Sequence, residues 1–161
     1  MGNSFQHLTG FFITFEGPEG CGKSTQISLF TSYLKTLDIG FELTREPGGT
    51  SIGESIRKIL LDPGNKAMNP IAEAYLYAAS RAQHVNEKIL PLLEKGINVI
   101  SDRYLDSSLI YQGVGRGIGM ERVMKINEEA VAEVIPGLCF VIMVRPEIGL
   151  KRAKETSRTD G

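Results

Sequence analysis

Gly17-Pro18-Glu19-Gly20-Cys21-Gly22-Lys23-Ser24-Thr25 is the stretch of this chain that decides its fold. It matches G-x-x-x-x-G-K-[ST], the P-loop pattern, in which backbone N–H groups surround phosphate oxygens. Glycines allow the tight curl, Lys23 supplies a cation for the β- and γ-phosphates, and Ser24 offers a hydroxyl to Mg²⁺. The stretch therefore predicts a nucleotide-phosphate site.

The residues on either side of the loop support this interpretation. Residues 11–15 form an apolar, β-rich run directly before it. After it, Ile27, Phe30, Leu34 and Leu37 recur at helical spacing. We expect a strand at about 11–16 and a helix at about 22–37, because a helix N-terminus also favours anions.

The rest of the chain alternates between strand and helix patterns. This predicts an α/β fold, a three-layer P-loop NTPase whose parallel sheet has helices on both faces and the strand order 2-3-1-4. Further strands are expected at 41–44, 97–101 and 138–144, the last apolar throughout and therefore buried on both faces. Helices are expected around 52–60, from Asn69 and Pro70 to a kink or break near Pro91, at 106–112, at 120–134 and from Pro146. A flexible glycine-rich loop is expected between Gly113 and Gly119.

Composition limits the class of protein. With 161 residues, 42% hydrophobic and 23% charged, the chain fits one soluble domain over 11–161 behind a flexible tail at 1–10. A net charge of -1 argues against a general nucleic-acid binder, and no apolar run reaches transmembrane length. The cysteines, Cys21 and Cys139, fit a reduced cytoplasmic protein, with Cys139 expected to be buried.

Three charged residues follow predicted strands and belong to the expected ligand edge of the sheet. Asp102 is a candidate for holding Mg²⁺, and a helix-capping or turn role is the alternative. Arg45 and Arg103 are candidates for a second phosphate site, separate from Lys23. Surface salt bridges are the alternative for these arginines.

A second set of side chains predicts a base-binding site. Tyr77 and Arg81 are four residues apart on one helix face, and Ser108 and Gln112 have the same spacing beside Tyr111. Such groups can stack on a base and read its edge, although tyrosines are more often core residues.

The end of the chain is basic, with Lys151, Arg152, Lys154 and Arg158. A solvated helix face is one interpretation. The other is a lid at about 150–161 that brings a cation to the transferring phosphate.

The chain resembles the bacterial type of thymidylate kinase over about residues 11–160. The matching stretches are 15–25, Thr44-Arg45-Glu46-Pro47-Gly48-Gly49-Thr50, Tyr77-Ala78-Ala79-Ser80-Arg81-Ala82-Gln83-His84, Asp102-Arg103-Tyr104, Asp106-Ser107-Ser108, Tyr111-Gln112-Gly113 and Gly115-Arg116-Gly117. The resemblance implies transfer of the ATP γ-phosphate to dTMP, giving dTDP, by a cytoplasmic enzyme that uses Mg²⁺ and usually forms a homodimer. It implies neither nucleic acid nor membrane as a partner.

The resemblance also implies roles for individual residues. All nine residues of 17–25 bind ATP, and Ser24 and Asp102 hold Mg²⁺. Substrate binding falls to Glu19 at the sugar, Arg45 and Arg103 at the phosphate, Tyr77 as the stacking ring, Arg81, Ser108 and Gln112 at the thymine, and Tyr111 under the deoxyribose. Catalysis falls to Lys23, Asp102 and Arg103, with Arg152 or Arg158 as the lid arginine because the P-loop itself contains none.

Three other functions stay open at this point. They are another P-loop nucleotide or nucleoside kinase, a switch GTPase, and a truncated nucleotide-binding form without activity. The GTPase is disfavoured because Asn65-Lys66-Ala67 is followed by Met68, which cannot read guanine. Members of the thymidylate kinase family continue after the lid with another strand and an adenine-binding loop. The resemblance therefore assigns no adenine contact to residues 1–161.

Overall fold

Four parallel strands form the centre of the computed structural model, which describes residues 8–132 and 134–159, with side chains through 155. The strands are β1 (Phe12–Glu16), β2 (Phe41–Arg45), β3 (Asn98–Asp102) and β4 (Leu138–Val141). Their order in the sheet is β2-β3-β1-β4, which confirms the predicted order. Phe15 pairs with Asp102 and with Phe140, so the carboxyl ends of the three neighbouring strands lie level with one another.

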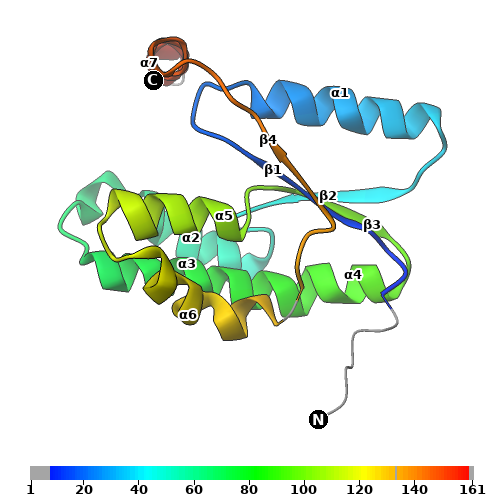
Figure 1. Cartoon of the computed structure of the whole chain (residues 1–161), viewed down its shortest axis with the longest axis horizontal. Coiled ribbons are helices and arrows are strands. Elements are labelled where there is room, and N and C mark those ends of the chain that lie inside the picture. Colours follow the sequence, from blue (N-terminus) through cyan, green and yellow to red (C-terminus); the bar gives the residue numbers. More distant parts are fainter. Residues whose placement is uncertain (1–7, 133, 160–161) are drawn as a thin grey trace.

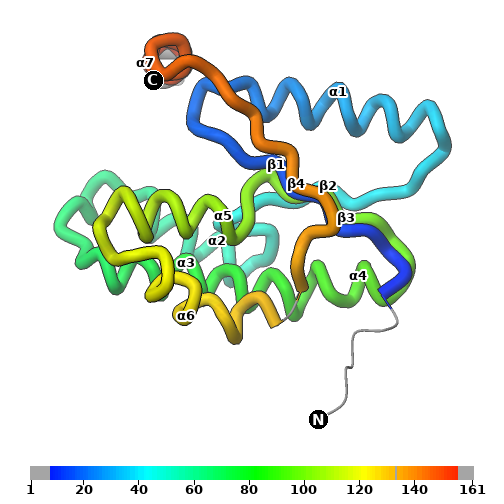
Figure 2. Tube along the Cα trace, in the orientation of Figure 1, coloured from blue at the N-terminus to red at the C-terminus, as the bar shows by residue number. Residues whose placement is uncertain are grey.

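Helices cover both faces of this sheet, as predicted (Figures 1 and 2). One face carries α1 (Lys23–Thr36), which leads directly out of the P-loop. The other carries α2 (Ser51–Leu61), α3 (Pro70–His84), α4 (Leu90–Glu94), α5 (Leu105–Ser108) and α6 (Met120–Val131), and α7 (Pro146–Thr159) follows β4. No helix in the described part of the chain combines the length and the apolar character needed to cross a membrane.

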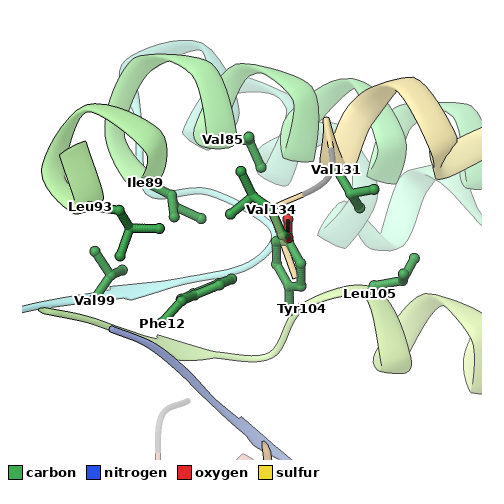
Figure 3. Packing of buried hydrophobic residues seen from close by; sticks show 9 residues of the cluster. All are labelled: Phe12, Val85, Ile89, Leu93, Val99, Tyr104, Leu105, Val131 and Val134. Atoms are coloured by element: carbon green, nitrogen blue, oxygen red, sulfur yellow. Dashed lines mark hydrogen bonds between the residues drawn. The ribbon is translucent and has the colours of Figure 1, made fainter. Parts of the chain in front are cut away.

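The strand period of two divides the core between the two faces. Phe12 and Val99 point to the larger helical layer and pack with Val85, Ile89 and other apolar side chains (Figure 3). Ile13, Phe15 and Ile100 alternate with them and pack against Ile27 and Leu34 of α1. Each buried side chain of this size contributes about 1.5–3 kcal/mol, so both faces hold the strand ends firmly in place.

The prediction that the fourth strand is buried on both faces is wrong. Val141 is 63% exposed, Leu138 is 41% exposed, and Cys139 is exposed rather than buried. The reason is position: β4 is the edge strand of the described sheet, whereas α1 contacts β1 and β3. Phe140 packs inward against Phe15 and Phe30, and Ile142, just past the end of β4, packs against the same core cluster.

Two local predictions also change. The helix that begins at Pro70 continues through a π turn at Val85–Ile89 into α4 and passes Pro91 before ending at Glu94. The wider π turn ends two residues before Pro91, which has no N–H to donate to the helix. Gly113 and Gly115 belong to a second π turn, Leu109–Gly115, whose last bond runs from Arg116 N to Tyr111 O (2.9 Å). That part of the expected loop is therefore helical.

The expected tail at 1–10 lies mostly outside the described residues. Within them, Leu8 packs against the larger core cluster and Gly10 N donates to Leu93 O (3.0 Å). Residues 8–10 therefore belong to the folded body.

Candidate active site

A cavity of about 860 Å³ opens at the carboxyl ends of the strands. It is lined by the P-loop, α2, α3, α7 and the segment that follows β3. Of the eight predicted substrate residues, it brings together all except Arg45: Glu19, Tyr77, Arg81, Arg103, Ser108, Tyr111 and Gln112. Ligand sites of open α/β sheets occur at this edge, and the volume is in the usual range for a small-molecule site.

The N-terminus of α1 is left open beside this cavity. Gly22 is the N-cap with φ 93°, a left-handed conformation that suits glycine, and no side chain caps the helix. The first hydrogen bond runs from Gln26 N to Gly22 O (3.1 Å). Within the described residues, no acceptor reaches the N–H groups of Lys23, Ser24 and Thr25. These amides, at the positive end of the helix dipole, suit an anionic ligand.

Lys23, the first residue of α1, lies close to Asp102, the last residue of β3. Lys23 Nζ donates to Gly17 O (3.1 Å) and lies 3.9 Å from Asp102 Oδ1. Asp102 is the last residue of β3, and its Oδ1 is buried without a hydrogen-bond partner. A buried carboxylate oxygen normally has a partner, so this one is suited to a ligand such as a cation.

These residues fit a magnesium ion. Mg²⁺ is usually held by one or two carboxylates together with substrate phosphates and water, rather than by a cage of protein ligands. The described residues contain no group of three or more His, Cys, Asp or Glu side chains that would form such a cage. The exposed hydroxyl of Ser24 and the unpartnered Asp102 Oδ1 supply the oxygen donors that this mode needs.

Arg103 enters the cavity because of an unusual backbone conformation. Its φ of 74° turns the chain sharply at the end of β3. Its Nη1 donates to Ser107 Oγ (3.0 Å), and its guanidinium lies 5.3 Å from the centroid of the Tyr111 ring. The side chain is therefore positioned from two sides, while it still lines the cavity.

Buried Glu16 supports this arrangement from beneath. Its carboxylate accepts from Ser107 Oγ (2.6 Å) and from Tyr104 N (2.7 Å). Burial raises the pKa of Glu16 above its usual range, although the two hydrogen bonds act in the opposite direction. Glu16 thereby ties the end of β1 to the turn that carries Arg103.

The structure does not bring Arg45 into this cavity. Its Nη2 donates to both carboxylate oxygens of Glu54 at 3.1 Å, and it lines a separate hollow of about 370 Å³. The preceding residue, Thr44, is buried, so strand alternation turns Arg45 outward to α2. Arg57 of α2 lines the main cavity instead, with Nη1 donating to Pro47 O (2.8 Å).

Arg81 is 1% exposed and is held on several sides at the far end of the cavity. Its Nε donates to Glu46 (2.8 Å), its Nη1 donates to Asn127, and its Nη2 donates to Tyr104 O and Ser108 Oγ, each at 3.1 Å. A guanidinium has five N–H donors, so these four bonds leave one for a ligand. His84 extends the network by bonding Glu46 through Nδ1 and Thr44 through Nε2.

Glu73 joins the two remaining polar side chains of the cavity. It accepts from Gln112 Nε2 (2.8 Å) and from Nη2 of Arg116 (2.6 Å). Tyr77 lies one turn further along α3, and burial together with the Glu73 charge raises the pKa of its phenol. Tyr77 is therefore a neutral ring at physiological pH.

Several residues that build this site received no role from the sequence: Glu16, Glu46, Arg57, Glu73, Ser107, Arg116 and Asn127. Of these, Glu16, Glu46, Ser107 and Arg116 belong to the stretches that match the thymidylate kinase pattern. A signal existed for Glu73, because Glu73, Tyr77 and Arg81 are spaced four residues apart and share one helix face. Arg57 and Asn127 belong to no motif, and only the packing of α2 and α6 against α3 identifies them.

The expected lid corresponds to α7, which contacts the P-loop. Gly149, Leu150 and Ala153 line the cavity. A Cβ on Gly20 would stand 2.2 Å from Gly149 O, so the two segments approach closely. Arg152 is exposed and is not among the lining residues, and the side chain of Arg158 lies outside the described residues.

Comparisons with known proteins agree on one family. A family model described as thymidylate kinase matches residues 15–160. The thymidylate kinase of Clostridium novyi is 46% identical over 151 residues, covering 94% of this chain and 74% of that protein. That of Lactobacillus acidophilus is 48% identical over 149 residues, covering 92% and 69%. The crystal structure of thymidylate kinase from Ehrlichia chaffeensis matches with a TM-score of 0.78 at 34% identity, over 94% of this chain and 86% of that one.

Proposed function

The chain belongs to the thymidylate kinase family and is a nucleoside monophosphate kinase that phosphorylates dTMP with ATP, and we propose that the transfer takes place in the cavity described above. One observation carries the proposal: a single cavity joins the P-loop side to seven of the eight residues expected to bind the acceptor. The family match favours this activity over the other P-loop kinases and the switch GTPase.

We assign the ATP phosphates to the P-loop. All nine residues of 17–25 surround them in this proposal, with the free amides of Lys23, Ser24 and Thr25 as donors. Ser24 and Asp102 hold Mg²⁺, which neutralises phosphate charge when bound. Lys23 contributes a fixed cation beside them, 3.9 Å from Asp102 Oδ1.

The dTMP phosphate lies, in this proposal, between Arg57 and Arg103. Both line the cavity, and both are anchored through another protein group, Arg57 by Pro47 O and Arg103 by Ser107. Anchored arginines lose little freedom on binding an anion and orient it for transfer. Glu19, on the loop, faces the sugar.

The thymine lies at the Arg81 end of the cavity. Tyr77 provides a ring face for stacking, and Arg81, Ser108 and Gln112 provide polar groups for the base edge. Tyr111, held beside Arg103, lies under the deoxyribose, where its bulk disfavours a 2′-hydroxyl.

Phosphoryl transfer needs no covalent bond to the protein. It needs the two substrates to be positioned and the charge of the transition state to be stabilised. Lys23 and Arg103 stabilise the charge on the transferring group in this proposal, and Asp102 orients the metal. Helix α7 serves as the lid, because its N-terminal half already lines the cavity. Arg152 and Arg158 remain the candidates for a lid arginine.

We further propose that the chain forms one kinase domain that includes residues 8–10, that it is located in the cytoplasm and that it forms a homodimer. Exposed apolar side chains of α3, the second π turn and α6 support the dimer: Tyr75, Ile110, Val114, Met120 and Met124. These three elements contact one another, so one partner could engage exposed apolar side chains from all of them. Light scattering of the wild-type chain and of a Val114→Asp variant measures this assembly, which the variant is expected to weaken.

Acceptor selectivity tests the functional assignment. ADP formation is followed with ATP and each of dTMP, dUMP, UMP, CMP and AMP. The highest kcat/KM is expected with dTMP. Equal or higher kcat/KM with CMP or AMP contradicts the proposal and favours another nucleotide kinase.

A further inference from the structure

We propose that Glu73, clamped by Arg116, is a positioning residue that fixes which end of the Gln112 amide faces the base. The proposal rests on the proposed function, because it concerns how the same cavity selects thymine. It adds two residues, from α3 and from the turn before α6, that touch no reacting atom.

The contacts place Glu73 behind Gln112. Gln112 is 3% exposed, and its Nε2 donates to Glu73 Oε1 (2.8 Å). Arg116 approaches the same carboxylate with two donors, Nη2 to Oε2 (2.6 Å) and Nε to Oε1 (3.3 Å). The forked guanidinium fixes the plane of the carboxylate, and the carboxylate in turn fixes the amide.

The chemistry of the pair allows only one amide orientation. An ionised carboxylate is acceptor-only, whereas a glutamine amide has one accepting and one donating end. The NH₂ end of Gln112 must therefore face Glu73, and the carbonyl end faces away from it. In the described part of the chain, no protein donor bonds to Gln112 Oε1. This oxygen is also absent from the fully buried atoms that lack a partner, so a ligand can reach it.

The cavity therefore presents an acceptor at Gln112. Thymine carries an N–H at N3, which can donate to that acceptor. Cytosine carries a lone pair at N3, which would face the carbonyl oxygen without a proton between them. Arg81 lines the same cavity and its guanidinium can only donate, which suits thymine, since thymine accepts at O4 where cytosine carries an amino group. Fixed polarity at Gln112 thus selects against cytosine.

The test compares dTMP with 5-methyl-dCMP, which has the same sugar, phosphate and methyl group but the opposite polarity at N3 and C4. Glu73→Gln keeps the shape of the side chain but can donate as well as accept, so Gln112 is free to turn over. The ratio of kcat/KM for dTMP to that for 5-methyl-dCMP is expected to fall by about tenfold, the worth of one neutral hydrogen bond.

Two further variants separate positioning from structure. Glu73→Asp keeps an acceptor-only carboxylate and should retain the ratio, even if both KM values rise. Glu87→Gln is the matched control, because Glu87 accepts from Gln83 Nε2 (2.5 Å) in a similar Gln–Glu pair that does not line the cavity. It should leave the ratio unchanged.

An unchanged ratio in Glu73→Gln, or an equal loss in Glu73→Asp, overturns the proposal. If Glu73→Gln fails to fold by circular dichroism, Arg116→Gln loosens the carboxylate instead, and an unchanged ratio there overturns it as well. A wild-type enzyme that does not prefer dTMP refutes the proposed function itself. A wild-type preference that survives in Glu73→Gln refutes only the role of Glu73.

Discussion

Replacing Arg57 with alanine tests the acceptor-phosphate site, because the structure places Arg57 in the cavity and Arg45 outside it. One N–H of Arg57 is engaged by Pro47 O at 2.8 Å, which leaves four donors for a phosphate. A charge-assisted hydrogen bond contributes about 1.5–3 kcal/mol. The Arg57→Ala variant is therefore expected to lose about 10- to 150-fold in kcat/KM for dTMP.

Arg45→Ala is the matched control. Its ion pair with Glu54 is on the surface, with side chains 55% and 39% exposed. Exposed pairs of this kind contribute about 0.2–1 kcal/mol to stability. Glu54 also keeps its bond from Gly49 N (3.1 Å), so the turn before α2 stays closed. We expect Arg45→Ala to change kcat/KM for dTMP by less than about threefold.

Steady-state ADP formation measures both variants, with dTMP varied at saturating ATP and then ATP varied at saturating dTMP. The KM for ATP should stay at the wild-type value in both, since neither arginine belongs to the P-loop. A loss in Arg45→Ala that equals the loss in Arg57→Ala would refute the placement of the acceptor phosphate. So would an Arg57→Ala variant whose main defect is in the KM for ATP.

Three predictions concern the framework of the site. Arg81→Met leaves the charge of Glu46 buried and should lower the free energy of unfolding in urea by about 3–5 kcal/mol; a loss under about 1 kcal/mol would contradict the buried network. Burial raises the pKa of Glu16, so the folded state binds the proton more tightly and stability is lost as pH rises from the ordinary value of 4.5 through the folded pKa. In Glu16→Gln this loss should be absent from melting temperatures measured across that window, and a profile parallel to the wild type would argue against it. Gly20→Ala places a Cβ 2.2 Å from Gly149 O at φ +71° and should raise the KM for ATP, whereas Gly40→Ala, with nothing within 4 Å, should not.

Local patterns were enough to predict most of the fold. The P-loop, the flanking strand and helix, and the alternation that follows led to the observed strand order, and Asn69 and Pro70 begin α3 as expected, with Asn69 Oδ1 accepting from Ile71 N (2.8 Å). The fourth strand shows the limit. Its apolar sequence indicates burial, but exposure depends on which elements cover a strand, and that is a tertiary property.

The site was predictable where residues belong to motifs and unpredictable where side-chain direction decides. Arg45 and Arg57 both lie close to the turn before α2. They differ in side-chain direction: Arg45 points away from the cavity to Glu54, whereas Arg57 points into the cavity. Arg81 was expected to face a base, yet most of its donors are committed to a buried network. Composition and spacing carry no information on how a guanidinium divides its five donors.

The most direct test of the central claim identifies the product of one reaction in wild type and in Lys23→Ala. ATP labelled on its γ-phosphate is incubated with dTMP and Mg²⁺, and the nucleotides are separated by chromatography. We predict that the wild-type enzyme moves the label to dTDP and that Lys23→Ala, which lacks the cation beside Asp102, moves it far more slowly. Label released as inorganic phosphate without dTDP, or an equal rate in Lys23→Ala, would contradict the claim that this cavity transfers phosphate to dTMP.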